Sequence, residues 1–355
     1  MHLNSFTKAG ILTIVLVVVF SVCWELYWRS RGFRATFNDD KILWATKRKQ
    51  IYQPANEATV FIGPSRIKFD LDVPTWEKLT GEKAVQLAIV GTSCRLILND
   101  LAKDEKFKGK LIIDATEFTL FSGAAQRDRS ATQTLDYYYK ETPSQKTSSA
   151  IDHALESNLV FLEEGKFGLN SLLYGMHVPD RRGVVSPPAF PKEFAVASFE
   201  RQSSFTPMFL SSEHLQNIQK NNWVQRNGWI KKSLTDKTIH GLKGDSLTNV
   251  FDQMKKAIDK IRSRGGQVLF VRPPSSGGYK KAEQIVYPRE EYWDKLLAYT
   301  NTPGIYYEDY PEVANFICPE WSHLSPADAV VYTKNLVKIL QEEKGWKFKQ
   351  PSIFN

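Results

Sequence analysis

The sequence predicts an α/β protein with a mostly parallel sheet, preceded by one N-terminal membrane-spanning helix. Short apolar runs that end in turn residues alternate with amphipathic helical segments at 58–121 and again at 245–342. This alternation is typical of parallel strands joined by helices. The membrane helix is predicted by Ala9–Trp28, a run of about 20 residues that is almost free of charge. Such a run is about 30 Å long as a helix, which is enough to cross a bilayer.

Five short apolar segments fit buried strands, and four longer segments have their apolar residues at helical spacing. The expected strands are Val60–Ile62, Ala84–Val90, Lys110–Asp114, Gln267–Val271 and Gly304–Tyr307. The expected helices are Ser93–Leu101, Leu247–Arg264, Arg289–Tyr299 and Ala327–Glu342. We therefore place one α/β domain at 58–345.

Two stretches interrupt this pattern. Residues 36–57 contain a mixed, partly helical piece and are expected to form a tether. Residues 122–244 are polar and aromatic-rich, and they are too long for a simple loop. We expect an insertion that covers one edge of the sheet as a lid or partner surface, because it lacks its own run of strands. Its expected helices are Thr132–Lys140, Ser148–Glu163 and Ser212–Asn221.

Composition is that of an ordinary globular protein, with 42% hydrophobic and 24% charged residues. The net charge is +8, but the basic residues are spread along the chain and form no dense block with interleaved aromatic residues. We therefore expect no nucleic-acid partner. A cationic surface that faces anionic glycans or lipid head groups fits the charge as well.

The three cysteines form no Cys-x-x-Cys pair and have no zinc-site spacing to histidine. We expect no metal and no cofactor. Cys94 and Cys318 are expected to be buried free thiols, with a disulfide in an oxidising compartment as the alternative.

The N-terminal run is expected to be an uncleaved anchor that occupies residues 1–35. Trp24, Tyr27 and Trp28 would form an interfacial belt at one end of it. The alternative is a cleaved signal peptide, which the bulky Val22–Trp24 at the end of the apolar run does not favour. Arginines after the run outnumber basic residues before it, so the positive-inside rule alone would keep the domain in the cytoplasm. Long domains translocate despite that bias, and the orientation stays open at this point.

Ser65 follows the first expected strand, in Gly63-Pro64-Ser65-Arg66. Ligands bind outside the carboxyl ends of strands in an open α/β sheet. If a helical turn begins at Ser65, its hydroxyl lies beside free backbone N–H groups, which suits a nucleophile that must stabilise an oxyanion. The alternative is an ordinary serine N-cap.

A second candidate stretch, Glu320-Trp321-Ser322-His323, precedes the last expected helix. A carboxylate three residues before a histidine can lie on the same side of a turn. It would then fix the imidazole tautomer and leave the other ring nitrogen free to act as a base. A structural histidine at a helix start is the alternative.

The order of these parts resembles the SGNH (GDSL-like) hydrolase superfamily, specifically its membrane-anchored bacterial members. Those include D-alanine transfer and alginate-acetylation proteins. Gly63–Arg66 is similar to the nucleophile block, Gln86–Gly91 to the second block and Glu320–Leu324 to the last block. The resemblance implies a three-layer α/β/α fold with Ser65 as nucleophile, His323 as base and Glu320 orienting the base. The Ser65 and Gly91 amides would form the oxyanion hole.

Two departures from the family pattern affect the site. Glu320 stands where the family usually has aspartate. In the third block, usually Gly-x-Asn-Asp, this chain has Ala115–Phe118, so no asparagine is present to complete the oxyanion hole. Glu117 would bring negative charge there, and a lost donor typically lowers the rate by about 10²–10³-fold. We expect Glu117 to pair with Arg66 or Arg272, two cations predicted near that edge.

The resemblance implies a membrane-anchored serine esterase or acyltransferase that acts on acyl esters of a glycan or another cell-envelope polymer. It also implies that the domain lies outside the cytoplasmic membrane, in the periplasm. The alternative is a catalytically impaired scaffold or binding module that partners a membrane acyltransferase or polysaccharide system. Glu117 and the missing asparagine favour the scaffold, and the presence of Ser65 and His323 favours the enzyme.

Overall fold

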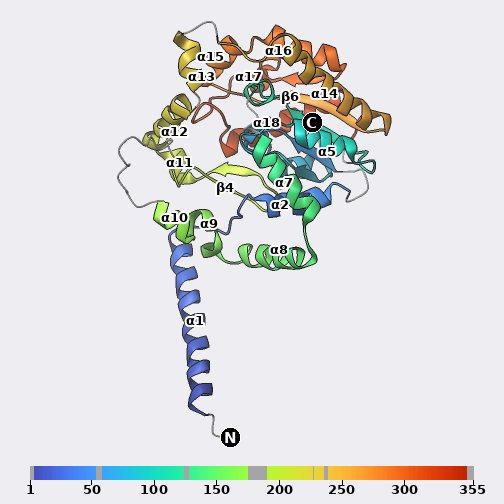
Figure 1. Ribbon diagram of the computed structural model, residues 1–355. Coiled ribbons are helices and arrows are strands. Elements are labelled where there is room, and N and C mark those ends of the chain that lie inside the picture. The colour runs from blue at the N-terminus through green and yellow to red at the C-terminus, as the bar shows by residue number, and fades with distance from the viewer. Residues whose placement is uncertain are drawn as a thin grey trace. The chain divides into compact units, whose positions relative to one another are not determined.

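The computed structural model describes residues 4–52, 58–123, 128–174, 190–226, 228–235 and 239–349. It divides into two compact units (Figure 1). The first unit comprises residues 1–38 and 141–184, and the second comprises residues 39–140 and 185–355.

The second unit is built on a five-stranded parallel sheet with the strand order β2-β1-β3-β6-β7. The strands are β1 (Thr59–Ile62), β2 (Ala84–Gln86), β3 (Lys110–Asp114), β6 (Gln267–Arg272) and β7 (Gly304–Tyr306). Every residue of β1 is buried, as expected for a central strand covered on both faces. The predicted α/β class with a parallel sheet is confirmed. Because all five strands are parallel, their carboxyl ends meet at one edge of the sheet.

Helices pack around this sheet through their apolar faces. The helices that pack together are α3 (Ser65–Asp70), α4 (Val73–Thr80), α5 (Arg95–Lys103), α14 (Gly244–Ser263), α16 (Arg289–Thr300), α17 (Pro311–Ala314) and α18 (Pro326–Glu342). Helix α14 buries Val250, Met254, Ile258 and Ile261 at the predicted spacing. Helix α18 begins one residue before the predicted start, with the Ser325 hydroxyl as N-cap acceptor and Pro326 as the first helical residue.

The expected tether contains a core helix, α2 (Lys41–Gln50). Trp44 is 1% exposed, and its indole N–H donates to the carbonyl oxygen of Leu87 at 2.9 Å. The short helix mixes lysines with buried apolar residues, so the sequence alone gave little sign of its burial. Residues 53–57 of the expected tether lie outside the described residues.

The insertion expected at 122–244 is shared between the two units. Its first helix, α7 (Arg129–Lys140), packs against α2 in the second unit. Residues 190–244 also belong to the second unit and contain β4 (Ala195–Ala197), β5 (Ser203–Phe205), α11 (Pro207–Ser211), α12 (Glu213–Arg226) and α13 (Gly228–Thr235). The antiparallel β4–β5 pair was not predicted, because three-residue strands carry almost no periodic signal. Residues 124–127 and 175–189 of the insertion lie outside the described residues.

The first unit joins the N-terminal helix α1 (Ser5–Ser30) to α8 (Pro143–Glu156), the 3₁₀ turn η2 (Val160–Leu162), α9 (Glu164–Phe167) and α10 (Leu169–Tyr174). Helix α1 is long and apolar enough to cross a membrane. The single helix expected at Ser148–Glu163 is instead two elements. Helix α8 starts earlier, at a capping box made by Thr142 and Gln145, and ends at Glu156.

Candidate active site

Ser65 is the first residue of α3 and follows β1 after a two-residue turn. The turn requires Gly63, whose φ is +152° and whose added Cβ would lie 2.5 Å from the Cβ of Asp114. The Asp114 carboxylate, at the end of β3, accepts the amide N–H of Ile67 at 3.2 Å and that of Thr116 at 2.9 Å. Asp114 therefore links α3 to the third strand and fixes the position of the serine.

The structure brings Ser65, His323 and Glu320 together, and these three residues are called the triad below. The Ser65 Oγ lies 2.8 Å from His323 Nε2, and His323 Nδ1 lies 3.0 Å from Glu320 Oε1. Ser65 is half-buried, whereas His323 and Glu320 are 2% and 0% exposed. The serine hydroxyl is thus the part of the triad that faces outward.

A backbone turn at Trp321 aims the Glu320 carboxylate at the histidine. Trp321 has φ +80°, a left-handed conformation that is uncommon for a bulky residue. The turn lets Glu320 Oε1 accept the amide N–H groups of Ser322 at 3.1 Å and His323 at 2.7 Å. The Trp321 ring covers Gly277, where an added Cβ would lie 2.3 Å from the indole. Packing thus holds a strained residue between the acid and the base.

Glu320 is stabilised as a carboxylate although it is fully buried. Burial alone raises its pKa, but the adjacent His323 and three N–H donors outweigh burial and hold the pKa of Glu320 below its ordinary value. One of these donors is the indole N–H of Trp223, in α12 of the insertion. A carboxylate that stays ionised next to an imidazole is the arrangement that stabilises an imidazolium.

Aromatic rings enclose the imidazole of His323. The nearest ring belongs to Phe69, with ring centroids 4.3 Å apart. Phe194, Phe205 and Trp223 lie 6.2–6.4 Å from the imidazole centroid, and all three come from the insertion. These rings exclude water from the base. Sequence analysis missed them, because nothing in the polar and aromatic-rich insertion indicated which rings face the site.

Gly91, the other predicted oxyanion donor, follows the second strand as expected. Beyond β2 the chain continues beside β1, since the Ile89 amide donates to the Gly63 carbonyl oxygen at 2.9 Å. Gly91 has φ +69° and is exposed, and no atom lies within 4 Å of a Cβ added there. The described structure gives no contact between Gly91 and Ser65, so its role stays a prediction.

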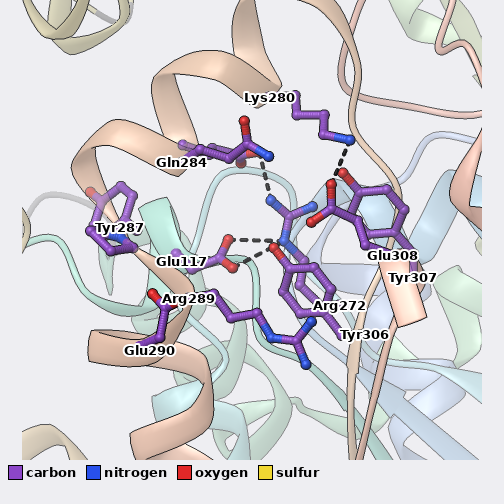
Figure 2. A pocket seen from close by; sticks show the side chains of 12 residues that line it. Glu117, Arg272, Lys280, Gln284, Tyr287, Arg289, Glu290, Tyr306, Tyr307 and Glu308 are labelled. Carbon is purple, nitrogen blue, oxygen red and sulfur yellow. Dashed lines mark hydrogen bonds and ion pairs between the residues drawn. The ribbon is translucent and has the colours of Figure 1, made fainter.

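Glu117 and Arg272 form the expected pair. Arg272 Nε donates to the two Glu117 carboxylate oxygens at 3.0 and 3.1 Å, and each residue is 2% exposed (Figure 2). Both line a pocket of about 250 Å³ at the carboxyl ends of β3, β6 and β7. No member of the triad lines that pocket. Glu117 is therefore a buried, neutralised carboxylate and does not point into solvent.

Arg66 pairs with a residue that sequence analysis missed, Glu283 in α15 (Gly277–Val286). Its Nη2 lies 2.7 Å from Glu283 Oε1, while Arg272 Nη2 lies 2.6 Å from Glu283 Oε2. Arg66 Nε also donates to the carbonyl oxygen of Ser322 at 3.2 Å. Arg66, Glu117, Arg272 and Glu283 are called the ion network below. It is tied to the triad through the loop that carries His323.

The two carboxylates of the ion network differ in acidity. Burial raises the pKa of Glu117, and Arg272 opposes this only in part because Glu283 lies nearby. Burial acts on Glu283 as well, but the two guanidinium groups outweigh it and lower its pKa.

A further buried acid, Asp70 at the end of α3, was also missed. It is 0% exposed and accepts the amide N–H of Leu324 at 2.9 Å, and burial raises its pKa well above the ordinary value. Asp70 thus ties the helix that begins at Ser65 to the residue after His323.

Among the described residues, no group of three or more histidine, cysteine or acidic side chains is placed to hold a metal ion. The described cysteines are free, and Cys94 and Cys318 are buried. Models of known protein families give no match to the sequence, and no curated protein matches it.

Proposed function

We propose that this chain is a membrane-anchored serine esterase or acyltransferase with an SGNH-like, three-layer α/β/α domain. The observation that supports it most directly is the continuous chain from Ser65 Oγ to His323 Nε2, at 2.8 Å, and from His323 Nδ1 to Glu320, at 3.0 Å. These distances fit a nucleophile, a general base and an orienting acid. The left-handed turn at Trp321, which aims the acid, supports the same reading.

In the proposed reaction the Ser65 oxygen attacks the carbonyl carbon of an acyl ester while its proton moves to His323 Nε2. The leaving alcohol takes that proton, and the acyl group remains on Ser65. Water or a hydroxyl group of an acceptor then attacks the acyl-serine, and Ser65 regains its proton through His323. Water gives hydrolysis and an acceptor hydroxyl gives acyl transfer. Glu320 holds the Nδ1 proton and stabilises the imidazolium in both steps.

The oxyanion that forms during attack would be held by backbone N–H groups of Ser65 and Gly91. The first amides of a helix have no acceptor within that helix, so the Ser65 amide is suited to this task. The third donor typical of the family is absent, and Glu117 stands in that block of the sequence. Its pairing with Arg272 removes much of the electrostatic penalty that a free carboxylate would impose.

The substrate class follows from the resemblance and from the anchor. Helix α1 is suited to hold the domain at a membrane, and the family resemblance favours the periplasmic side. We therefore propose acyl esters of a glycan or another cell-envelope polymer as substrates.

Labelling with a fluorophosphonate probe tests the proposal. Wild-type protein should be labelled at Ser65, and Ser65→Ala should abolish labelling while the unfolding midpoint stays within error of the wild type. Absence of label on folded wild-type protein would contradict an active serine.

The second candidate function is a scaffold that binds a membrane acyltransferase or a polymer without turnover. The buried Glu117 and the missing asparagine favour it. Glu117→Asn separates the two proposals. If the wild type is an enzyme, this change breaks the pair with Arg272 and lowers turnover of an aryl acetate. If the wild type is a scaffold, the new amide donor raises turnover and probe labelling from near zero.

A further inference from the structure

Helix α8 turns Ser149 and Glu156 toward its own unit, whereas Ile151 and Leu155 face outward. Ser149 is 5% exposed, and Glu156 accepts a hydrogen bond from the Asn38 side chain at 2.7 Å. Ile151 and Leu155 lie one turn apart on the opposite side and are 55% and 45% exposed. A surface helix in water has the reverse arrangement, with its apolar stripe toward the core. The outward face of α8 is therefore suited to an apolar or interfacial environment.

A second exposed pair occurs in α10 of the same unit. Leu169 and Leu173 also lie one helical turn apart and are 70% and 47% exposed. Isolated apolar residues on a surface are normal, but two i,i+4 pairs in one small unit require a reason.

Both pairs are tied to the last turn of α1. Arg29 Nη2 donates to the carbonyl oxygen of Asn158 at 2.9 Å, and the ring centroids of Trp28 and Phe167 are 4.7 Å apart. The interaction of Glu25 with Val160 adds a third tie, because its carboxylate accepts that amide N–H at 2.9 and 3.0 Å.

Chain connectivity then limits how far the apolar pairs lie from the end of α1. Leu155 precedes Asn158 by three residues and Leu169 follows Phe167 by two, so neither can be more than about 11 Å of chain from its tie point. If α1 spans a bilayer, Trp24, Tyr27 and Trp28 mark the interface. The two pairs then lie at the level of the head groups.

We propose that α8 and α10 are interfacial helices that insert Ile151, Leu155, Leu169 and Leu173 into the head-group boundary of the bilayer around α1. This inference rests on the membrane anchor proposed above. The rest of the outward face of α8 suits head groups, because it carries the hydroxyl residues Ser144, Thr147 and Ser148. Amphipathic helices of this kind bury their apolar face about 5–10 Å into the boundary. The short chain distance of the two pairs from the end of the membrane helix favours a lipid surface over a protein partner.

Lipid quenching tests the inference on the full-length protein in liposomes of phosphatidylcholine and phosphatidylglycerol. A bimane label is attached at Leu155→Cys or Leu169→Cys in a Cys23→Ser background; Cys94 and Cys318 are buried. Lys146→Cys is the matched control, since Lys146 is exposed on the opposite side of α8 from Ile151 and Leu155. Val18→Cys reports on insertion of α1.

Brominated lipids should reduce emission by roughly half at Leu155→Cys and Leu169→Cys and leave Lys146→Cys unchanged. Quenching at Val18→Cys without quenching at Leu155→Cys or Leu169→Cys would overturn the inference, although α1 would still be a membrane anchor. The exposed apolar pairs would then be expected to bind a membrane-protein partner. No quenching at Val18→Cys would overturn both the anchor and the inference.

Discussion

The triad and the ion network are both buried at the carboxyl edge of one sheet, yet they hold charge in different ways. In the triad a single carboxylate, Glu320, is stabilised by N–H donors and an imidazole. In the ion network two arginines alternate with two glutamates in a row of short contacts, Arg66–Glu283–Arg272–Glu117. The first arrangement leaves a proton free to move along one line of atoms. The second holds its groups in place by attraction between opposite charges.

The triad is therefore suited to catalysis, and the ion network is suited to stabilise the same edge of the sheet. The link between them is Arg66, which follows the nucleophile in sequence and donates to the carbonyl oxygen of Ser322, next to the base. The ion network therefore holds the start of α3, which carries Ser65, against the loop that carries His323. Changes to the triad should reduce turnover, and changes to the network should reduce stability.

The largest expected effect is on turnover by Glu320→Gln. The amide cannot stabilise the imidazolium and favours the wrong tautomer, so kcat for an aryl acetate should fall by about 10⁴-fold. Asp309→Asn is the control, because Asp309 pairs with Arg289 at a half-exposed site away from His323. Unchanged turnover in Glu320→Gln together with lost turnover in Asp309→Asn would show that the acid is wrongly assigned.

The next effect is on stability, through Glu283→Gln. The change removes the carboxylate that pairs with Arg66 and leaves the buried Arg272 paired with Glu117. Loss of one partner in a buried charge cluster typically lowers the free energy of unfolding by about 3–5 kcal/mol. Asp259→Asn disrupts an exposed pair with Lys255 and should change stability by less than about 0.5 kcal/mol. Equal effects in urea unfolding would mean that the ion network does not hold the edge together.

Local sequence order was enough to predict the triad and the pairing of Glu117 with an arginine. Ser65 and Glu117 follow strands after short turns, and Glu320 and His323 precede the last helix. Parallel strands bring positions after their carboxyl ends to one edge of the sheet. Glu283 was missed because α15 follows Pro273-Pro274-Ser275-Ser276 and begins with two glycines, a stretch typical of a loop. Its helix is stabilised by burial of Tyr279, Ala282 and Val286, which only the tertiary structure supplies. The same holds for Trp223, whose role depends on a contact with Glu320 across 97 positions.

The smallest expected effect is on how the free energy of unfolding changes with pH. The two sites should differ here, because the pKa values of Glu320 and Glu117 are shifted in opposite directions. The folded-state pKa of Glu320 is lowered below its ordinary value of 4.5, by contacts that outweigh burial. Its contribution to stability is therefore present above about pH 4.5 and is lost as pH falls through the folded-state pKa. The stability deficit of Glu320→Gln relative to wild type should shrink on acidification.

The stability difference between wild type and a Glu117 variant should change with pH in the opposite direction. Its pKa is raised by burial, so its ionised form is less favourable in the folded protein than in the unfolded chain. That penalty is absent below the unfolded-state pKa of about 4.5 and grows as pH rises through the folded-state pKa. Relative to wild type, Glu117→Gln should therefore become progressively more stable with rising pH. Urea unfolding of both variants and the wild type from about pH 2 to about pH 8 measures the two slopes, because the Glu320 slope lies below about pH 4.5 and the Glu117 slope lies above it. Parallel slopes would mean that Arg272 stabilises the Glu117 carboxylate as fully as the N–H donors stabilise Glu320, and the contrast between the two sites would then fail.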